Sequence, residues 1–182
     1  MAATGMMTSD QRPGFALLYL REEEIRLGME LLFFGYRGFT AGPDAELEEV
    51  GLGRAHHRAL YFIGRSPGLS VSDLLEILGI TKQSLARVLK ALQEQDYVAI
   101  ARGPQDGRQR LLRLTEKGAA LERRAFEAQR ETLARAYREA GPAAVDGFRR
   151  VLRGLAGKEA ARFLDEAAAR RAPLERSSGD AA

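Results

Sequence analysis

The sequence contains no cysteine, and only two of its 182 residues are histidine. The absence of cysteine excludes disulfides, thiolate metal ligands, cysteine nucleophiles and thiol-based redox sensing within this chain. No apolar run approaches the roughly 20 residues that a helix needs to cross a bilayer. Residues 1–13 also lack the apolar core of a secretory signal. We therefore expect a cytoplasmic protein that has no membrane partner.

Common catalytic motifs are missing as well. There is no glycine-rich phosphate loop, and no serine, histidine and acid stand in a spacing known from hydrolases. Acidic residues and arginines are spread along predicted helices, as surface pairs are. We therefore expect a protein that is not an enzyme and has no cofactor. With 45% hydrophobic and 29% charged residues, the chain has the composition of a globular protein.

A first amphipathic helix is predicted near the N-terminus. Its apolar residues recur at helical spacings and are Leu18, Ile25, Met29, Leu32 and Tyr36. Gly35, Gly38 and the Gly42-Pro43 pair predict the end of this helix. The polar, glycine-rich segment 41–53 is therefore predicted to be a loop, with at most one short helical turn.

A short helix bounded by turn residues is predicted after a helix over residues 54–65. Ser66-Pro67-Gly68 stops the earlier helix. Ser70 has the position of an N-cap, with Asp73 three residues later as in a capping box. The apolar residues of the short helix are Leu74, Leu75 and Leu78. Gly79 then supplies a turn, so the arrangement predicts the first half of a helix-turn-helix.

The helix from Lys82 to about Gln95 carries the most informative pattern. Thr81 caps it, because a threonine hydroxyl can accept an unpaired N–H of the first turn. One face is apolar and consists of Leu85, Val88, Leu89 and Leu92. A second face is polar and mostly basic and consists of Gln83, Arg87, Lys90 and Glu94. This separation of an apolar face from a basic face predicts a DNA recognition helix. The major groove of DNA admits one helix, whose outer side chains reach the base edges.

Individual contacts to DNA can be assigned on this polar face. Gln83 and Ser84 lie in the first turn, where recognition helices usually touch bases. Gln83 can bond adenine and Arg87 can bond guanine, each through two hydrogen bonds. Lys82 and Lys90 suit phosphates, which set register rather than sequence. Taken alone, a polar stripe of this kind is equally consistent with a helix face that only contacts water. The turn before the helix and the hairpin after it favour DNA binding.

A two-stranded hairpin with a basic tip is predicted after Asp96, where alternation replaces the helical pattern. The residues predicted on its inner side are Val98, Ile100, Leu112 and Leu114, and those pointing away are Tyr97, Ala99 and Ala101. Residues 80–113 hold seven lysines or arginines and three acids, a net charge of +4, although the whole chain carries +3. A basic loop beside a recognition helix can reach a minor groove. Asp106 can orient Arg108 through a charge-assisted hydrogen bond.

Two helices are predicted beyond the hairpin. Thr115 caps a long helix that reaches about Glu139, and Gly141-Pro142 ends it and begins the last helix. The apolar residues of the last helix are Val145, Phe148, Leu152, Leu155 and Phe163. The first helix and these two carry wide apolar faces that a small winged lobe cannot cover, which predicts a second copy of the chain as partner.

The predicted fold class is mainly α with a small β-hairpin wing, a winged helix-turn-helix with N- and C-terminal dimerisation helices. Five segments follow from it. Flexible tails are predicted at residues 1–14 and 170–182. Residues 15–53 are the N-terminal dimerisation helix and loop, 54–115 the winged DNA-binding lobe, and 116–169 the C-terminal dimerisation helices.

Three segments together resemble the MarR family of bacterial regulators. They are Ile80-Thr81-Lys82-Gln83-Ser84-Leu85, Asp106-Gly107-Arg108 and Leu112-Arg113-Leu114-Thr115-Glu116-Lys117-Gly118. The family pattern of a wing Asp-x-Arg followed by Leu-x-Leu-Thr-x-x-Gly is matched in order and spacing. The resemblance spans roughly Leu18 to Phe163. Residues 54–58 and 81–84 further resemble the PetP-type subgroup of this family.

This resemblance implies a homodimer with intertwined terminal helices, whose two winged lobes bind a pseudo-palindromic double-stranded operator. It places the wing arginine, here Arg108, in the minor groove, and it implies for some members a small aromatic or anionic effector. The predicted DNA-binding residues are Thr81, Lys82, Gln83, Ser84, Arg87, Lys90, Arg102, Asp106, Arg108 and Arg110. The weaker candidates for an effector site are Phe34, His57, Arg58 and Tyr61.

Plainer interpretations remain open for several of these residues. His56 and His57 point about 100° apart on a helix and cannot readily chelate one metal ion together. His56 shares a face with Leu60, which favours a packed structural role. An aromatic cluster of Phe33, Phe34, Tyr36, Phe39 and Phe62 is more often core or dimer interface than effector pocket. The alternative function is a winged-helix protein-interaction module, but arginines at 102, 108 and 110 favour DNA.

Overall fold

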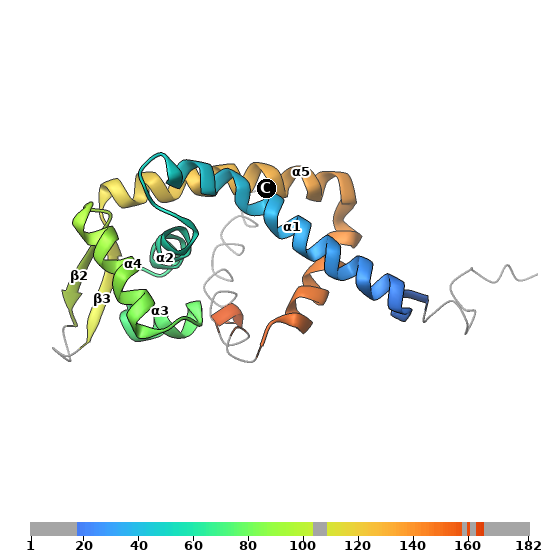
Figure 1. Ribbon diagram of the computed structural model, residues 1–182, viewed down its shortest axis with the longest axis horizontal. Helices are drawn as coiled ribbons and strands as arrows, with labels where there is room; N and C mark the ends of the chain where they lie inside the picture. The colour runs from blue at the N-terminus through green and yellow to red at the C-terminus, as the bar shows by residue number, and fades with distance from the viewer. Residues whose placement is uncertain (1–17, 104–108, 158–159, 161–162, 166–182) are drawn as a thin grey trace, which may run out of the picture. The chain divides into compact units, whose positions relative to one another are not determined.

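The computed structural model describes residues 18–103, 109–157, 160 and 163–165 (Figure 1). The elements in chain order are η1 (Leu18–Leu20), α1 (Glu22–Glu48), α2 (Arg54–Arg65), β1 (Leu69–Ser70), α3 (Val71–Leu78), α4 (Lys82–Glu94), β2 (Val98–Arg102), β3 (Arg110–Leu114) and α5 (Glu116–Leu155). The chain divides into two compact units, Met1–Ala41 and Gly42–Ala182, and each is described by itself. The predicted class, mainly α with a small β wing, is confirmed.

Helix α1 is longer than the sequence predicted. It continues past Gly35 and Gly38 and through the Gly42-Pro43 pair to Glu48. The predicted helix end at these residues is therefore wrong, and so is the predicted loop over 41–53, of which only 49–53 lie outside a helix.

Packing inside the second unit explains why α1 does not end at Gly42. A Cβ atom on Gly42 would lie 3.0 Å from the Cβ of Ala128, so α1 and α5 approach each other closely here. Pro43 is fully buried, and Glu46 accepts a hydrogen bond from Arg124 at 3.0 Å. These tertiary contacts offset the backbone hydrogen bond that proline removes from a helix interior.

The two helices α3 and α4 begin where the predicted caps Ser70 and Thr81 place them. The Ser70 hydroxyl accepts the Asp73 N–H at 3.1 Å and donates to the Asp73 carboxylate at 2.8 Å. The Thr81 hydroxyl accepts the Ser84 N–H at 3.1 Å. Gly79 ends α3 with φ 59° and ψ 33°, a left-handed conformation that favours glycine. Sequence-local chemistry therefore sets the turn between α3 and α4.

The small sheet has three antiparallel strands in the order β1-β3-β2. The predicted hairpin is confirmed, with Ile100 opposite Leu112 and Arg102 opposite Arg110. Strand β1 was not predicted, because two residues are too few to show alternation. It pairs with β3 through Leu69 opposite Leu112, so the wing is joined to the turn before α3.

Tyr97 is buried, and the prediction that it points away from the core is wrong. It follows α4 directly, where Asp96 adopts φ 58° and the Tyr97 N–H donates to the Leu92 carbonyl at 2.8 Å. This is the hydrogen-bond pattern of a Schellman helix end. The ammonium of Lys117 lies 4.5 Å from the centre of the Tyr97 ring. Tyr97 thus belongs to the helix end, where strand alternation does not apply.

The core of the second unit joins all of its larger elements. Its fully buried large side chains include Leu60 and Ile63 of α2, Leu74 of α3, Leu85 and Leu92 of α4, Leu112 of β3 and Leu121 of α5. The segment labelled α5 contains a break at Gly141, with φ 78° and ψ 167°, which confirms the predicted boundary between two helices. Among the residues described, no helix combines the length and apolar character needed to cross a membrane.

Candidate nucleic-acid interface

Helix α4 separates a packed face from an exposed polar face. The predicted apolar stripe is confirmed, because Leu85 and Leu92 are 1% and 0% exposed and Val88 and Leu89 are also buried. The residues exposed on the remaining surface include Thr81, Lys82, Gln83, Ser84, Arg87 and Lys90. The packed stripe fixes the helix to the lobe, so these polar side chains are presented to solvent together.

The hydroxyls at the start of α4 bond to each other as well as to the backbone. The Thr81 hydroxyl donates to the Ser84 hydroxyl at 2.9 Å while it accepts the Ser84 N–H. The Ser84 hydroxyl keeps its own proton free to donate outward. The cap therefore holds the first turn rigid and leaves a donor on its surface.

Two cations on α4 remain available for a partner. The Lys90 Nζ lies 3.7 Å from the Glu94 Oε1, and both side chains are mostly exposed. An ion pair of this kind is weak in water. Arg87 forms no ion pair with any residue that the structure describes. Both cations can therefore turn to a phosphate or a base without giving up a strong contact.

The base of the wing carries two arginines on neighbouring strands. Arg102 and Arg110 are exposed and directly opposite each other in the register of β2 and β3. The Gly103 N–H donates to the Gln109 carbonyl at 2.8 Å and extends the hairpin by one step. Like charges directly opposite each other destabilise a hairpin, and an anion between them removes that repulsion. The predicted contacts of Asp106 and Arg108 lie outside the described residues.

The motif Leu-x-Leu-Thr-x-x-Gly acts as a structural joint. The Thr115 hydroxyl donates to the Asp96 carbonyl at 2.6 Å and accepts the Gly118 N–H at 3.0 Å. A Cβ on Gly118 would lie 1.9 Å from the Tyr97 carbonyl oxygen, so only glycine fits. Lys117, which the sequence did not single out, donates to the Gln95 carbonyl at 2.8 Å. These contacts fix the end of α4 and the start of α5 together.

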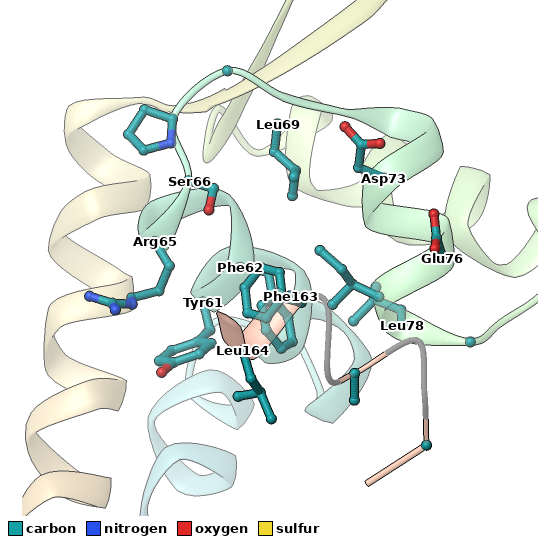
Figure 2. Close-up of a pocket in the computed structure, with 16 residues that line it drawn as sticks. Tyr61, Phe62, Arg65, Ser66, Leu69, Asp73, Glu76, Leu78, Phe163 and Leu164 are labelled. Carbon is teal, nitrogen blue, oxygen red and sulfur yellow. The ribbon is translucent and has the colours of Figure 1, made fainter. Parts of the chain in front are cut away.

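The four candidates for an effector site have different surroundings. Phe34 is exposed on α1 in the first unit, and Arg58 is exposed on α2. His57 is buried, and this burial lowers its pKa, with Arg58 adding to the effect and Asp44 opposing it. Tyr61 lines a cavity of about 840 Å³ in the second unit (Figure 2). Of the three candidates in the second unit, Tyr61 alone is among the lining residues described.

His56 has the structural surroundings that its pattern predicted. Its Nδ1 accepts the Gly53 N–H at 3.1 Å at the start of α2, and burial lowers its pKa. Within the described ranges, no three His, Asp or Glu side chains come close enough together to hold a metal ion. The histidines are therefore explained as parts of the α2 helix and its packing.

The fold and this surface define a winged helix-turn-helix protein with a basic, exposed recognition helix. A model of the MarR family matches residues 50–109. The HTH-type transcriptional regulator PetP of Rhodobacter capsulatus is 54% identical over 142 residues, which are 78% of this chain and 86% of that protein. The chain therefore belongs to the MarR family, and its resemblance to the PetP-type subgroup is confirmed.

Solved structures of the family share the fold. The crystal structure of MarR is 25% identical with a TM-score of 0.57, and the match covers 74% of this chain and 97% of that one. The crystal structure of Streptococcus pneumoniae FabT in complex with DNA is 18% identical with a TM-score of 0.64, and the match covers 78% and 98% of the two chains.

Proposed function

We propose that this protein is a transcriptional regulator of the MarR type that binds double-stranded DNA as a homodimer in the cytoplasm. The observation that carries the proposal is the exposed polar face of α4 opposite a fully packed apolar stripe. The similar PetP is named a transcriptional regulator, and the similar FabT was crystallised with DNA. Family membership and surface chemistry thus point to the same activity.

The roles on α4 divide between base reading and positioning. Gln83 and Arg87 read base edges in the major groove, because amide and guanidinium groups match adenine and guanine with two hydrogen bonds each. Lys82 and Lys90 bind phosphates and set the register. The hydroxyls of Thr81 and Ser84 hold the first turn in place, and Ser84 can donate to the DNA backbone.

The wing supplies the second contact. Arg102 and Arg110 form a paired cationic base, and a DNA phosphate between them would relieve their repulsion. Arg108, oriented by Asp106, is proposed to enter the minor groove, where a narrow groove attracts arginine. The winged lobe is then the segment 54–115.

Dimerisation is proposed through segments 15–53 and 116–169. Exposed apolar residues of α1 are Ile25, Leu27, Met29, Leu31, Leu32, Phe33, Phe34 and Tyr36, and those near the end of α5 are Phe148, Val151, Leu152 and Leu155. Apolar surface in such continuous stretches usually marks an interface. A second copy of the chain offers the same faces, so a symmetric pair covers both sets. An effector bound near Phe34, His57, Arg58 and Tyr61 stays a prediction.

The test is a salt-titrated binding assay with DNA from upstream of the protein's own gene and an excess of random competitor DNA. We expect binding that survives the competitor and weakens steeply as salt rises. A footprint of two half-sites about one helical turn apart is expected for a dimer. Binding that is lost to the competitor on every fragment of a genome-wide selection would contradict the proposal and favour a protein-interaction module.

Single substitutions separate the proposed roles. Arg87→Ala is expected to cost about 1–3 kcal/mol at one base position and to relax preference there. Lys82→Ala should weaken binding to all sequences alike and lower the salt dependence. Arg138→Ala removes the same charge from an exposed position on α5 and is the matched control. If all three variants lost the same DNA affinity, only the net charge of the protein would matter and the assigned contacts would be wrong.

A further inference from the structure

The residues that follow α4 are held by residues at the start of α5. Gln95, Asp96 and Tyr97 succeed one another in the chain, and the backbone carbonyl of each accepts a hydrogen bond from α5 or its cap. The Tyr97 carbonyl accepts the Thr115 N–H at 3.1 Å, and the Asp96 carbonyl accepts the Thr115 hydroxyl at 2.6 Å. The Gln95 carbonyl accepts the Lys117 ammonium at 2.8 Å. The end of α4 and the start of α5 therefore lie side by side (Figure 1).

Lys117 adds two contacts that the Thr115 cap does not supply. Its ammonium bonds to the carbonyl of Gln95, the C-cap residue of α4. Carbonyls at a helix C-terminus lack partners within the helix and carry partial negative charge, so a cation there is favourable. The same ammonium lies 4.5 Å from the centre of the buried Tyr97 ring, which attracts a cation to its face. Lys117 itself is exposed, so its replacement should leave the core intact.

These contacts lie at the opposite end of α4 from its first turn, which is proposed to touch DNA bases. Helix α4 has 13 residues, so its first turn is about 20 Å from the Gln95 carbonyl. At that distance, a tilt of about 5° moves the first turn by about 2 Å. A binding site must be held to within about 0.5 Å of its productive geometry. A small change in the contacts of Lys117 is therefore enough to change DNA recognition.

We propose that Lys117 is a positioning residue, which fixes the orientation of α4 on α5 and thereby sets the half-site spacing that the dimer accepts. The inference rests on the proposed binding of operator DNA by a homodimer. Helix α5 lies in the segment proposed for dimerisation, so the two copies of α4 take their relative placement from the two copies of α5. One base pair added between the half-sites moves one of them by about 3.4 Å and turns it by about 35°. A fixed α4 cannot follow this change.

The first measurement follows the orientation of α4 without DNA. The chain contains no cysteine, so Ala86→Cys on α4 and Glu131→Cys on α5, both at exposed positions, place two spin labels at defined sites. Labelled chains are diluted into unlabelled protein, and pulsed electron resonance gives the distance between the two labels within one chain. Lys117→Met should broaden or shift this distance. Lys117→Arg keeps a cationic donor and should restore it. An unchanged distance in Lys117→Met would overturn the proposal.

The second measurement compares operator duplexes of different spacing. The probes are made from the footprinted operator, either unchanged or with one base pair added to or removed from its centre. Lys117→Met should bind the original spacing about three- to tenfold more weakly than the parent, which is the value of one hydrogen bond. Its preference for the original spacing over the altered ones should shrink by a similar factor, because α4 can then reorient. Lys117→Arg should restore both values.

The salt dependence separates positioning from direct contact with DNA. A lysine that neutralises one phosphate contributes about 0.9 to the slope of log affinity against log salt concentration. Lys82→Ala should therefore lower this slope, whereas Lys117→Met should leave it unchanged. Arg138→Met removes a charge from another exposed position of α5 and is the matched control. It should change neither the label distance, nor the spacing preference, nor the slope.

The outcomes distinguish this inference from the proposed function. A lowered slope in Lys117→Met would make Lys117 a phosphate contact and overturn the inference. A spacing preference equal to that of the parent would also overturn it, and both results leave operator binding by the parent intact. If the parent protein binds no operator, the proposed function fails, and the label distances still decide whether Lys117 holds α4.

Discussion

The helices α1 and α4 carry similar amphipathic patterns but meet different surroundings. In α4 the apolar residues Leu85 and Leu92 are 1% and 0% exposed, because the winged lobe covers them. In the first unit, Met29 and Phe34 of α1 are 67% and 62% exposed. Exposing such side chains to water costs free energy in proportion to their apolar area. The comparison teaches that the lobe completes its own core, whereas the apolar side chains of α1 in the first unit stay exposed, as the proposed dimer requires.

The largest effect is expected from Gly118→Ala, which attacks the self-sufficient lobe. The new Cβ would lie 1.9 Å from the Tyr97 carbonyl oxygen, and this backbone atom cannot move without shifting the end of α4. We expect a loss of about 3 kcal/mol or more in the free energy of unfolding, measured by chemical denaturation. The control is Gly64→Ala, whose Cβ would meet side-chain atoms only, those of Leu114 at 3.0 Å and of Glu122 at 3.6 Å. Equal losses would show that the backbone contact is unimportant.

The next effect is expected from Phe34→Asp, which attacks the exposed apolar face of α1 through which the dimer is proposed to form. A carboxylate buried without a counter-charge in a dimer interface should raise the dissociation constant about a hundredfold or more. The winged lobe should keep its denaturation midpoint when the protein is monomeric. Glu30→Gln, at an exposed polar position of the same helix, is the control. Sedimentation analysis of both variants checks the prediction, and an unchanged dimer in Phe34→Asp would remove α1 from the interface.

A smaller effect should distinguish the two threonine caps within the lobe. Thr81→Ala removes one cap hydrogen bond and should cost about 1 kcal/mol of unfolding free energy. Thr115→Ala removes a cap and also the bond to the Asp96 carbonyl, so it should cost about 2 kcal/mol. Thr132→Ala, in mid-helix, is a control for threonine loss. If Thr81→Ala and Thr115→Ala lowered the unfolding free energy equally, the hydrogen bond from Thr115 to the Asp96 carbonyl would contribute nothing to stability.

The smallest effect is expected from pH. Burial lowers the pKa of His56 and His57 below the usual 6.5, so the unfolded chain binds protons that the folded chain does not. The free energy of unfolding should therefore be highest above pH 6.5 and fall as pH drops below it. His57→Gln should flatten this slope, measured by denaturation between pH 7.5 and 5.5. Burial raises the pKa of Glu122 from its usual 4.5, and this effect has the opposite sign, so Glu122→Gln should steepen the fall in unfolding free energy when the series is extended down to pH 4.5.

Much of the lobe could be predicted from local sequence. The caps at Ser70, Thr81 and Thr115, the buried stripe of α4 and the break at Gly141 all depend on residues within one turn of each other. Such features follow from side-chain chemistry and helical spacing alone. The residues proposed for DNA, from Lys82 to Lys90, could be predicted for the same reason. Their exposure is a consequence of the stripe that packs behind them.

Other features were decided by contacts between distant parts of the chain. Helix α1 passes through Pro43 because α5 packs against it, with Arg124 bonded to Glu46 across 78 positions. Tyr97 is buried because α4 ends in a left-handed residue and Lys117 covers its ring. The cavity beside Ser66 exists because α2, α3 and a distant C-terminal residue, Phe163, meet there. The hydrophobic periodicity of a sequence describes one helix or strand at a time. The sequence by itself therefore determined which helices and strands form and which polar side chains they expose. Only tertiary packing decided how far α1 extends, where Tyr97 lies and which cavity the elements enclose.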